Sequence, residues 1–231
     1  MDDRPAAPWP LQDPPDPAAV AAEKELADEL RRIINRLVLV RPPAEELVAA
    51  AEGARQFADL LDGLRARVGA GPVSEAGLAP LDHVRHSPQS GTSNPLAPPV
   101  ELWDLDERSN GALHVGGRVC FGAAYEGPPG HVHGGHLAAM FDELLGKAQR
   151  APGFTARLTV NYRQPAPLHK DLTLRGWVDS LDGRKRIVKG TCHRGDVLLA
   201  EADGLFLAPK DRSFQEHLEA SLARHASGAG D

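Results

Sequence analysis

The feature that most constrains the fold is one helical segment followed directly by consecutive strands. Residues 131–150 have the apolar spacing of a helix, and four stretches with strand character come after it: 155–163, 172–180, 186–193 and 197–207. The pairs Asp182-Gly183 and Gly195-Asp196 separate the last three stretches, and such pairs favour tight hairpin turns. We therefore predict that these three strands form an antiparallel meander.

A further strand is predicted before the helix. Residues 111–125 read as one long strand with a bend or bulge at Gly116-Gly117. One helix against consecutive antiparallel strands is an α+β arrangement, in which a curled sheet wraps the helix and buries it. We predict this single domain over residues 98–210, with edge strands that invite pairing with a second copy.

The rest of the chain is predicted to be helical or irregular. Residues 1–17 are rich in proline, which removes backbone donors, and are predicted to be a disordered tail. Residues 18–70 are predicted to form a helical hairpin extension, interrupted at Pro42-Pro43, that packs on the main domain or across a dimer. The Gly-, Pro- and Ser-rich residues 71–97 are predicted as a loop or linker, and 211–231 as a short C-terminal helix and tail.

Both segments of the hairpin have apolar side chains at helical spacing, with polar ones between them. In the first segment the apolar residues are Leu26, Leu30, Ile33, Ile34 and Leu37. In the second they are Leu47, Ala50, Ala54, Phe57, Leu61, Leu64 and Val68. The second set forms a seam that requires a partner surface. Neither segment has the basic polar face that binding to a lipid surface favours.

Charge and composition exclude some classes of function. The chain has 26 Lys and Arg against 32 Asp and Glu, a formal charge of -6, which argues against a general nucleic-acid binder. The two cysteines, Cys120 and Cys192, are far apart and are expected to be reduced thiols. Residues 1–4 lack a basic signal-peptide start and no apolar run is long enough to span a bilayer, so we expect a cytoplasmic protein without a membrane span.

The predicted helix has two faces of different character. One face is bulky and apolar, with Leu137, Met140, Phe141, Leu144, Leu145 and Ala148. The other face has Gly135, Ala138, Ala139, Asp142 and Gly146, which are three or four residues apart. A row of small side chains lets a ligand or another backbone come close, and Asp142 is the one carboxylate among them. This position makes Asp142 a candidate catalytic residue.

The start of the same helix is a candidate anion site. Gly134 and Gly135 are placed where backbone N–H groups have no intrahelical acceptor and lie at the positive end of the helix dipole. Groups of this kind can hold an oxyanion that develops during acyl transfer.

Together these segments resemble the hot-dog fold acyl-CoA thioesterases of the thioesterase superfamily. The resemblance rests on residues 125–135, which include His133-Gly134-Gly135, on Asp142 nine residues after His133, and on residues 155–168. It continues into the turn that begins at Asp182 and covers roughly residues 100–208. The sequence is similar to the mitochondrial long-chain acyl-CoA thioesterases and, more distantly, to the phenylacetate-pathway thioesterases.

The resemblance implies a homodimer that has its site between subunits. Association of two such dimers stays open, and no cofactor is expected. By position, Gly134 would donate its N–H to the thioester carbonyl. Asp142 of the other subunit would act as a general base on water or attack directly, and these alternatives stay open. Thr155 would hold the carboxylate or the water, and His133 would position the Gly-Gly turn or contact the thioester. Position 136 is His where the family more often has a small or apolar residue.

Other residues are expected to contact the substrate. Gly135 and Asn161 are included because they belong to the matching segments. Arg184, Lys185 and Arg186 form a local basic cluster that fits the phosphates of coenzyme A, or else an ordinary solvated turn. A zinc site at the neighbouring histidines is not favoured because no second group of His or Cys follows, and no metal is expected.

Two other hypotheses compete with the thioesterase. The first is a hot-dog module that binds acyl-CoA or an acyl carrier protein without turnover, and uses the N-terminal helices for interaction. The second is a hot-dog dehydratase, whose arrangement of histidine and acid is not evident in the sequence. Asp142 distinguishes enzyme from binding module, because a binder should tolerate its loss. The length of the acyl group is not predicted.

Overall fold

A computed structural model describes residues 16–68, 84–151 and 153–210. The predictions for residues 1–15, for residues 71–83 of the linker and for the C-terminal helix within 211–231 lie outside the described residues.

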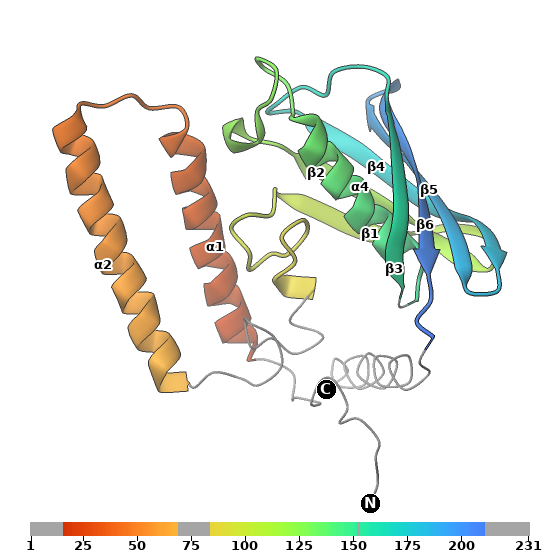
Figure 1. The fold of residues 1–231 in the computed structure, drawn as a ribbon, viewed down its shortest axis with the longest axis horizontal. Coiled ribbons are helices and arrows are strands. Elements are labelled where there is room, and N and C mark those ends of the chain that lie inside the picture. Colours follow the sequence, from red (N-terminus) through yellow and green to blue (C-terminus); the bar gives the residue numbers. More distant parts are fainter. Residues whose placement is uncertain (1–15, 69–83, 152, 211–231) are drawn as a thin grey trace, which may run out of the picture.

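The main domain is built on one six-stranded antiparallel sheet with the order β1-β2-β4-β5-β6-β3 (Figure 1). The strands are β1 (Val100–Ser109), β2 (Ala112–Cys120), β3 (Phe154–Tyr162), β4 (Asp171–Asp182), β5 (Lys185–Arg194) and β6 (Val197–Leu207). The meander of β4, β5 and β6 is confirmed. Its two hairpin turns contain Gly183 and Gly195 at positive φ, a conformation that glycine adopts without strain.

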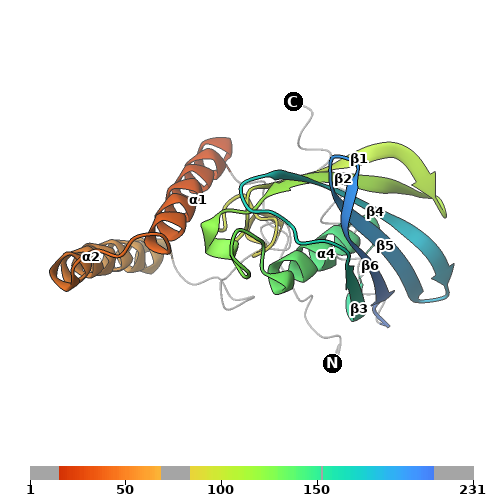
Figure 2. The ribbon, with the colours of Figure 1, turned by 90° about the horizontal axis from the view of Figure 1, so that it is seen from above.

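Helix α4 (Gly134–Ala148) lies against the concave face of the sheet, which curves around it (Figure 2). The predicted apolar face is the buried one, with Leu137, Met140, Phe141, Leu144, Leu145 and Ala148. Glycines in the sheet let it approach closely. A Cβ at Gly190 would lie 2.9 Å from Leu145 Cδ2 and 3.0 Å from a backbone oxygen. The predicted α+β hot-dog architecture is therefore confirmed.

The first part of the sheet differs from the prediction. The strand predicted over 111–125 ends at Cys120, and the 3-10 helix η1 (Ala123–Tyr125) follows it. Strand β1 was not predicted because its sequence is strongly charged, which an edge strand tolerates. Asn110 and Gly111, both at positive φ, make the two-residue turn to β2. An Asn-Gly pair is a hairpin signal, so the sequence did contain the information.

Two helices, α1 (Pro17–Leu37) and α2 (Ala44–Val68), precede the domain, and α2 lies beyond α1 (Figures 1 and 2). The side chains of α1 that are buried are Ala27 and Arg31. Members of its predicted apolar stripe stay exposed, with Ile33 at 53% and Leu37 at 59%. Helix α1 therefore contacts the rest of the chain through the polar side chains of Arg31 and Asn35, while part of its apolar stripe stays exposed. Within the described residues, no helix combines the length and apolarity needed to cross a bilayer.

Residues 84–97, predicted as part of a linker, fold into a compact loop between α1 and the domain. We call this segment the 84–97 loop. Gly91 and Ala97 are buried in it, and its backbone bonds to itself, with Gly91 N–H donating to the Ser87 carbonyl and Ser93 N–H to that of Arg85. Gly91 is required by packing, because a Cβ there would lie 2.4 Å from the Arg85 carbonyl oxygen.

Candidate functional site

His133 begins the helix that carries the candidate site. It is the N-cap residue of α4, and its Nδ1 accepts a hydrogen bond from the Gly135 N–H at 3.0 Å. The cap satisfies one N–H group that the first turn leaves without an acceptor. The His133 N–H itself donates to the Tyr125 carbonyl. The predicted positioning of the Gly-Gly turn by His133 thus has a structural basis, and its contact with a thioester stays a prediction.

Tyr162 fixes the other side of this turn. Its hydroxyl donates to the Gly134 carbonyl at 2.7 Å. Among the described residues, no hydrogen bond of the Gly134 N–H is found, which leaves this donor available at the helix N-terminus. Tyr162 lies within the matching residues 155–168, but the sequence predicts no role for it. Its spacing from the glycines in sequence contains no signal of this contact.

Asp142 and Thr155 are joined by a hydrogen bond. Thr155, the second residue of β3, donates its hydroxyl to Asp142 Oδ1 at 2.8 Å. Asp142 is partly buried on the small face of α4. The hydrogen bond holds one carboxylate oxygen and leaves the other to accept a proton or to attack. Whether Thr155 also holds a water molecule stays a prediction.

A cavity of about 700 Å³ surrounds this carboxylate. Asp142 and Thr155 line it together with Gly146 and Gly153 from the main domain. Strand β1 and the 84–97 loop also line the cavity and contribute Val84, Ser90, Thr92, Val100, Glu101 and Leu102. A volume of this size is typical of small-molecule sites.

Gly134 lies in a different cavity. That cavity, of about 310 Å³, is lined by Gly134, Leu137 and Tyr162 and by residues around Pro165. Asp142 is eight residues further along the helix than Gly134, roughly 12 Å at about 1.5 Å per residue. An attacking oxygen must approach within about 3–3.5 Å of the carbon it attacks. One chain therefore cannot place its own Gly134 N–H and its own Asp142 on the same thioester.

The remaining predicted residues lie on the sheet. Asn161 is exposed on β3, near the Gly134 end of the strand. Arg186 lies in register with Phe206 of β6, which in turn is in register with Thr155. This places Arg186 two strands from Thr155, about 10 Å away. Lys185 is the first residue of β5 and Arg184 is in the turn before it, at the same end of the sheet, where Arg184 Nε donates to the Ala208 carbonyl.

His136 is in the first turn of α4, beside the N-cap. Its ring lies 5.1 Å from that of Tyr125 and 5.9 Å from that of His133. Desolvation lowers the pKa of His136, and the nearby His133 lowers it further. No group of three or more His, Cys, Asp or Glu that suits a metal ion occurs within the described residues.

A helix wrapped by an antiparallel sheet, with N–H groups at its start and a hydrogen-bonded carboxylate along its length, defines a hot-dog fold of the thioesterase type. Sequence and structure comparisons agree with this class. The sequence pattern of the thioesterase superfamily matches residues 129–201. A crystal structure described as a thioesterase superfamily protein is similar over 89% of this chain and 98% of its own chain, with 33% identity and a TM-score of 0.68. The chain belongs to the thioesterase superfamily.

Curated relatives match a shorter part of the chain. The acyl-coenzyme A thioesterase THEM4 of Bos taurus is 34% identical over 104 residues, which are 44% of this chain and 42% of the relative. The protein of the same name from Xenopus laevis is 39% identical over 93 residues, or 37% of this chain and 41% of the relative. The chain thus spans less than half the length of these relatives.

Proposed function

We propose that the protein is an acyl-CoA thioesterase that hydrolyses an acyl-CoA to the free acid and coenzyme A. The observation that carries the proposal is Asp142, held by Thr155 at 2.8 Å and facing a cavity of about 700 Å³. The names of the curated relatives support acyl-CoA as the substrate. The basic cluster Arg184, Lys185 and Arg186 would contact the phosphates of coenzyme A, at the sheet end that also has Thr155.

In the proposed reaction the Gly134 N–H donates to the thioester carbonyl oxygen and stabilises the negative charge that develops there. Asp142 either removes a proton from a water molecule that attacks the carbonyl carbon, or attacks that carbon itself. The C–S bond then breaks and coenzyme A leaves as a thiolate that takes up a proton. Attack by water releases the free acid at this point, whereas attack by Asp142 forms an acyl anhydride with the enzyme, which a water molecule must then hydrolyse to release the acid and restore the carboxylate. Gly135 and Asn161 would line the path of the substrate next to Gly134.

We propose that the site forms between two subunits of a homodimer. Strand β3 is an edge of the sheet within the described chain. Two copies of one edge strand related by a two-fold axis pair antiparallel. Such pairing sets the Thr155 end of one β3 beside the Tyr162 end of the other, and so brings Asp142 of one subunit toward Gly134 of its partner. The exposure of Phe154, 64%, and Tyr162, 52%, on this strand supports an interface there.

The first test is steady-state hydrolysis of acyl-CoA substrates from acetyl to palmitoyl, including an aryl-CoA, with detection of the free thiol. We expect Asp142→Asn to lower kcat by at least about a hundredfold, or about 2.7 kcal/mol of transition-state stabilisation. Asp179→Asn, an exposed carboxylate on β4 that pairs with Lys189, is the matched control. Equal turnover in native protein and Asp142→Asn would reject the mechanism and favour a module that binds without turnover.

The second test removes a single N–H group. Gly134 is the first residue of α4, a position that proline tolerates, so Gly134→Pro deletes the proposed donor and preserves the helix start. Gly134→Ala retains the N–H, and its Cβ would be 3.4 Å from Tyr162. We expect a loss of roughly a hundredfold or more in kcat for Gly134→Pro. A comparable loss in Gly134→Ala would assign the effect to space instead of the donor.

Mixing subunits tests the shared site directly. Gly134→Pro and Asp142→Asn are each expected to be inactive as homodimers. A mixed dimer would contain one intact site, made from Gly134 of one subunit and Asp142 of the other. With random pairing the mixture should regain about a quarter of the native activity. A site within one chain would regain none.

A further inference from the structure

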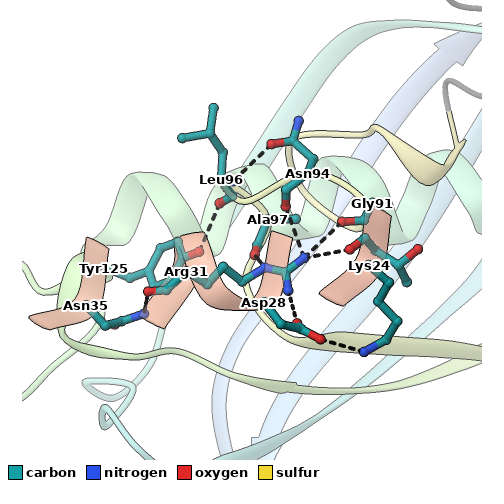
Figure 3. A network of polar contacts seen from close by, with 10 residues as sticks. Lys24, Asp28, Arg31, Asn35, Gly91, Asn94, Leu96, Ala97 and Tyr125 are labelled. Carbon is teal, nitrogen blue, oxygen red and sulfur yellow. Dashed lines mark hydrogen bonds and ion pairs between the residues drawn. The ribbon is translucent and has the colours of Figure 1, made fainter. Parts of the chain in front are cut away.

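Helix α1 carries a buried cation at its contact with the domain. Arg31 is 8% exposed. Its Nε donates to the Ala97 carbonyl at 2.8 Å, and its Nη2 donates to the carbonyls of Thr92 at 2.9 Å, Asn94 at 3.1 Å and Gly91 at 3.4 Å. Its Nη1 forms an ion pair with Asp28. Figure 3 shows the guanidinium group enclosed by these acceptors.

Every carbonyl that Arg31 contacts belongs to the 84–97 loop. The planar guanidinium group has five donors in a fixed geometry, so it can hold several carbonyls at once in a way that a lysine cannot. Four carbonyls between positions 91 and 97 are thereby held by one side chain. The bonds to Ala97 and Gly91 are buried, and leaving those two acceptors without a donor would be unfavourable, so the loop conformation depends on Arg31.

A second side chain of α1 connects the same network to η1 of the main domain. Asn35 Oδ1 accepts from the Ala124 N–H at 3.1 Å, and its Nδ2 donates to the Arg31 carbonyl at 2.9 Å. The Tyr125 hydroxyl donates to the Leu96 carbonyl at 2.9 Å, from the other side of the loop (Figure 3). The 84–97 loop is thus bonded both to α1 and to η1.

The other side of the loop faces the candidate site. Val84, Ser90 and Thr92 line the cavity that contains Asp142. The Ser90 hydroxyl also donates to the carboxylate of Glu143, the residue next to Asp142 on α4. A shift of the loop would therefore change the wall of the cavity without touching the carboxylate itself.

We infer that Arg31 is a positioning residue that fixes the 84–97 loop as the substrate-binding wall of the Asp142 cavity. This inference rests on the proposed function, because it assigns that cavity to the acyl-CoA. The N-terminal extension then takes part in substrate selection: a loosened wall binds the acyl group less well and discriminates less between acyl lengths. The reacting groups Asp142 and Gly134 lie outside this network.

The test compares Arg31→Gln with Arg32→Gln. Arg32 is the neighbouring residue on α1, is exposed, and pairs with Glu29. We expect Arg31→Gln to raise KM about tenfold for the preferred acyl-CoA, with kcat changed less than about threefold, and to flatten the profile of kcat/KM against acyl length. Hydrogen exchange of the amides of residues 84–97 should be about tenfold faster. Arg32→Gln should match the native protein in KM, in the acyl-length profile and in amide exchange.

Ser90→Ala tests the same wall independently, in case Arg31→Gln does not fold. It removes the contact with Glu143 and leaves the bonds of Arg31 in place. We expect it to raise KM several-fold with normal exchange in the rest of the loop. Faster exchange in Arg31→Gln with native KM and native acyl-length profile would overturn the inference, since the contact would then be structural only. Unchanged KM in Ser90→Ala with a native profile would overturn it too.

Failure of the proposed function can be distinguished from failure of the role inferred for Arg31. If the native protein hydrolyses no acyl-CoA, binding of an S-alkyl-CoA thioether, titrated over several chain lengths, replaces KM as the measurement. Weaker and less length-selective binding by Arg31→Gln would then support the wall, while the hydrolase proposal would fall alone. If the native protein neither hydrolyses the acyl-CoA thioesters nor binds the S-alkyl-CoA thioethers, both the proposed function and the role of Arg31 are rejected.

Discussion

Helices α4 and α1 are held in place by different interactions: α4 packs on the sheet through apolar side chains, and α1 contacts the 84–97 loop and η1 through hydrogen bonds. On α4, the residues that face the sheet are apolar and fully buried, as for Leu144 and Leu145 at 0% exposure. On α1, the contact is made by Arg31 and Asn35 through hydrogen bonds, while Ile33 stays 53% exposed. Burial of apolar surface is strong but not directional, whereas hydrogen bonds define position. The domain is therefore stabilised by its core, and α1 mainly fixes where the 84–97 loop lies.

The largest expected difference between the two regions is in stability. Leu144→Ala removes a side chain that is 0% exposed in the core and should cost about 2–5 kcal/mol of unfolding free energy. Leu60→Ala on α2, at 55% exposure, should change it by less than about 0.5 kcal/mol. Urea unfolding followed by circular dichroism measures both. A cost above about 2 kcal/mol for Leu60→Ala would break the comparison, because it would mean that this face of α2 is covered in solution.

The polar attachment of α1 should be weaker than the core but measurable. Asn35→Ala removes the acceptor of the Ala124 N–H and should destabilise the protein by about 1–2 kcal/mol. Glu29→Ala, an exposed position on the same helix, is the control and should change little. Unfolding midpoints of the two variants in urea give the comparison. Equal midpoints would mean that the contact of Asn35 adds nothing to the attachment.

Activity can be separated from stability on β3. Thr155→Val retains the shape but lacks the hydroxyl that donates to Asp142, so we expect kcat to fall about tenfold with little change in unfolding free energy. Thr155→Ser, which retains the hydroxyl, should recover most of the activity. Steady-state kinetics on the preferred acyl-CoA decides the question. The same loss in both variants would show that the methyl group matters instead of the hydrogen bond.

The smallest effect expected is a pH dependence from His136. Its pKa is lowered by desolvation and by His133, so the folded protein binds a proton there less readily than the unfolded chain. This contribution to stability is complete above the ordinary value of about 6.5 and is lost as pH falls through the lowered pKa. His136→Asn should therefore lose less stability than the native protein between about pH 7.5 and 5. Identical pH profiles of the urea midpoint would contradict this assignment.

Local patterns in the sequence were enough to predict much of the domain. The apolar face of residues 131–150 gave the buried face of α4, because helical periodicity directly reflects burial. The Asp182-Gly183 and Gly195-Asp196 pairs located two hairpin turns, since glycine adopts positive φ without strain. The pairing of Thr155 with Asp142 came from the family resemblance, and the hydrogen bond agrees with it.

Local patterns failed where the environment of a residue is set by distant parts of the chain. Strand β1 was missed because an edge strand can be charged, although Asn110-Gly111 indicated its turn. The face of α1 that contacts the domain was also missed. An apolar stripe is normally the buried one, but here Ile33 and Leu37 of the stripe are exposed. Arg31 and Asn35, four residues apart, make the hydrogen bonds to the 84–97 loop and to η1.

The sequence by itself determined the order of helix and strands, the buried face of α4 and the position of the candidate carboxylate. These follow from periodicity and turn residues, which act over a few neighbours. Only the tertiary structure decided that Arg31 binds carbonyls 60 to 66 positions away, that the Tyr162 hydroxyl donates to the Gly134 carbonyl, and that Gly134 and Asp142 lie in separate cavities. Backbone carbonyls are the same in every residue, so no sequence pattern records which of them a buried guanidinium group will bind.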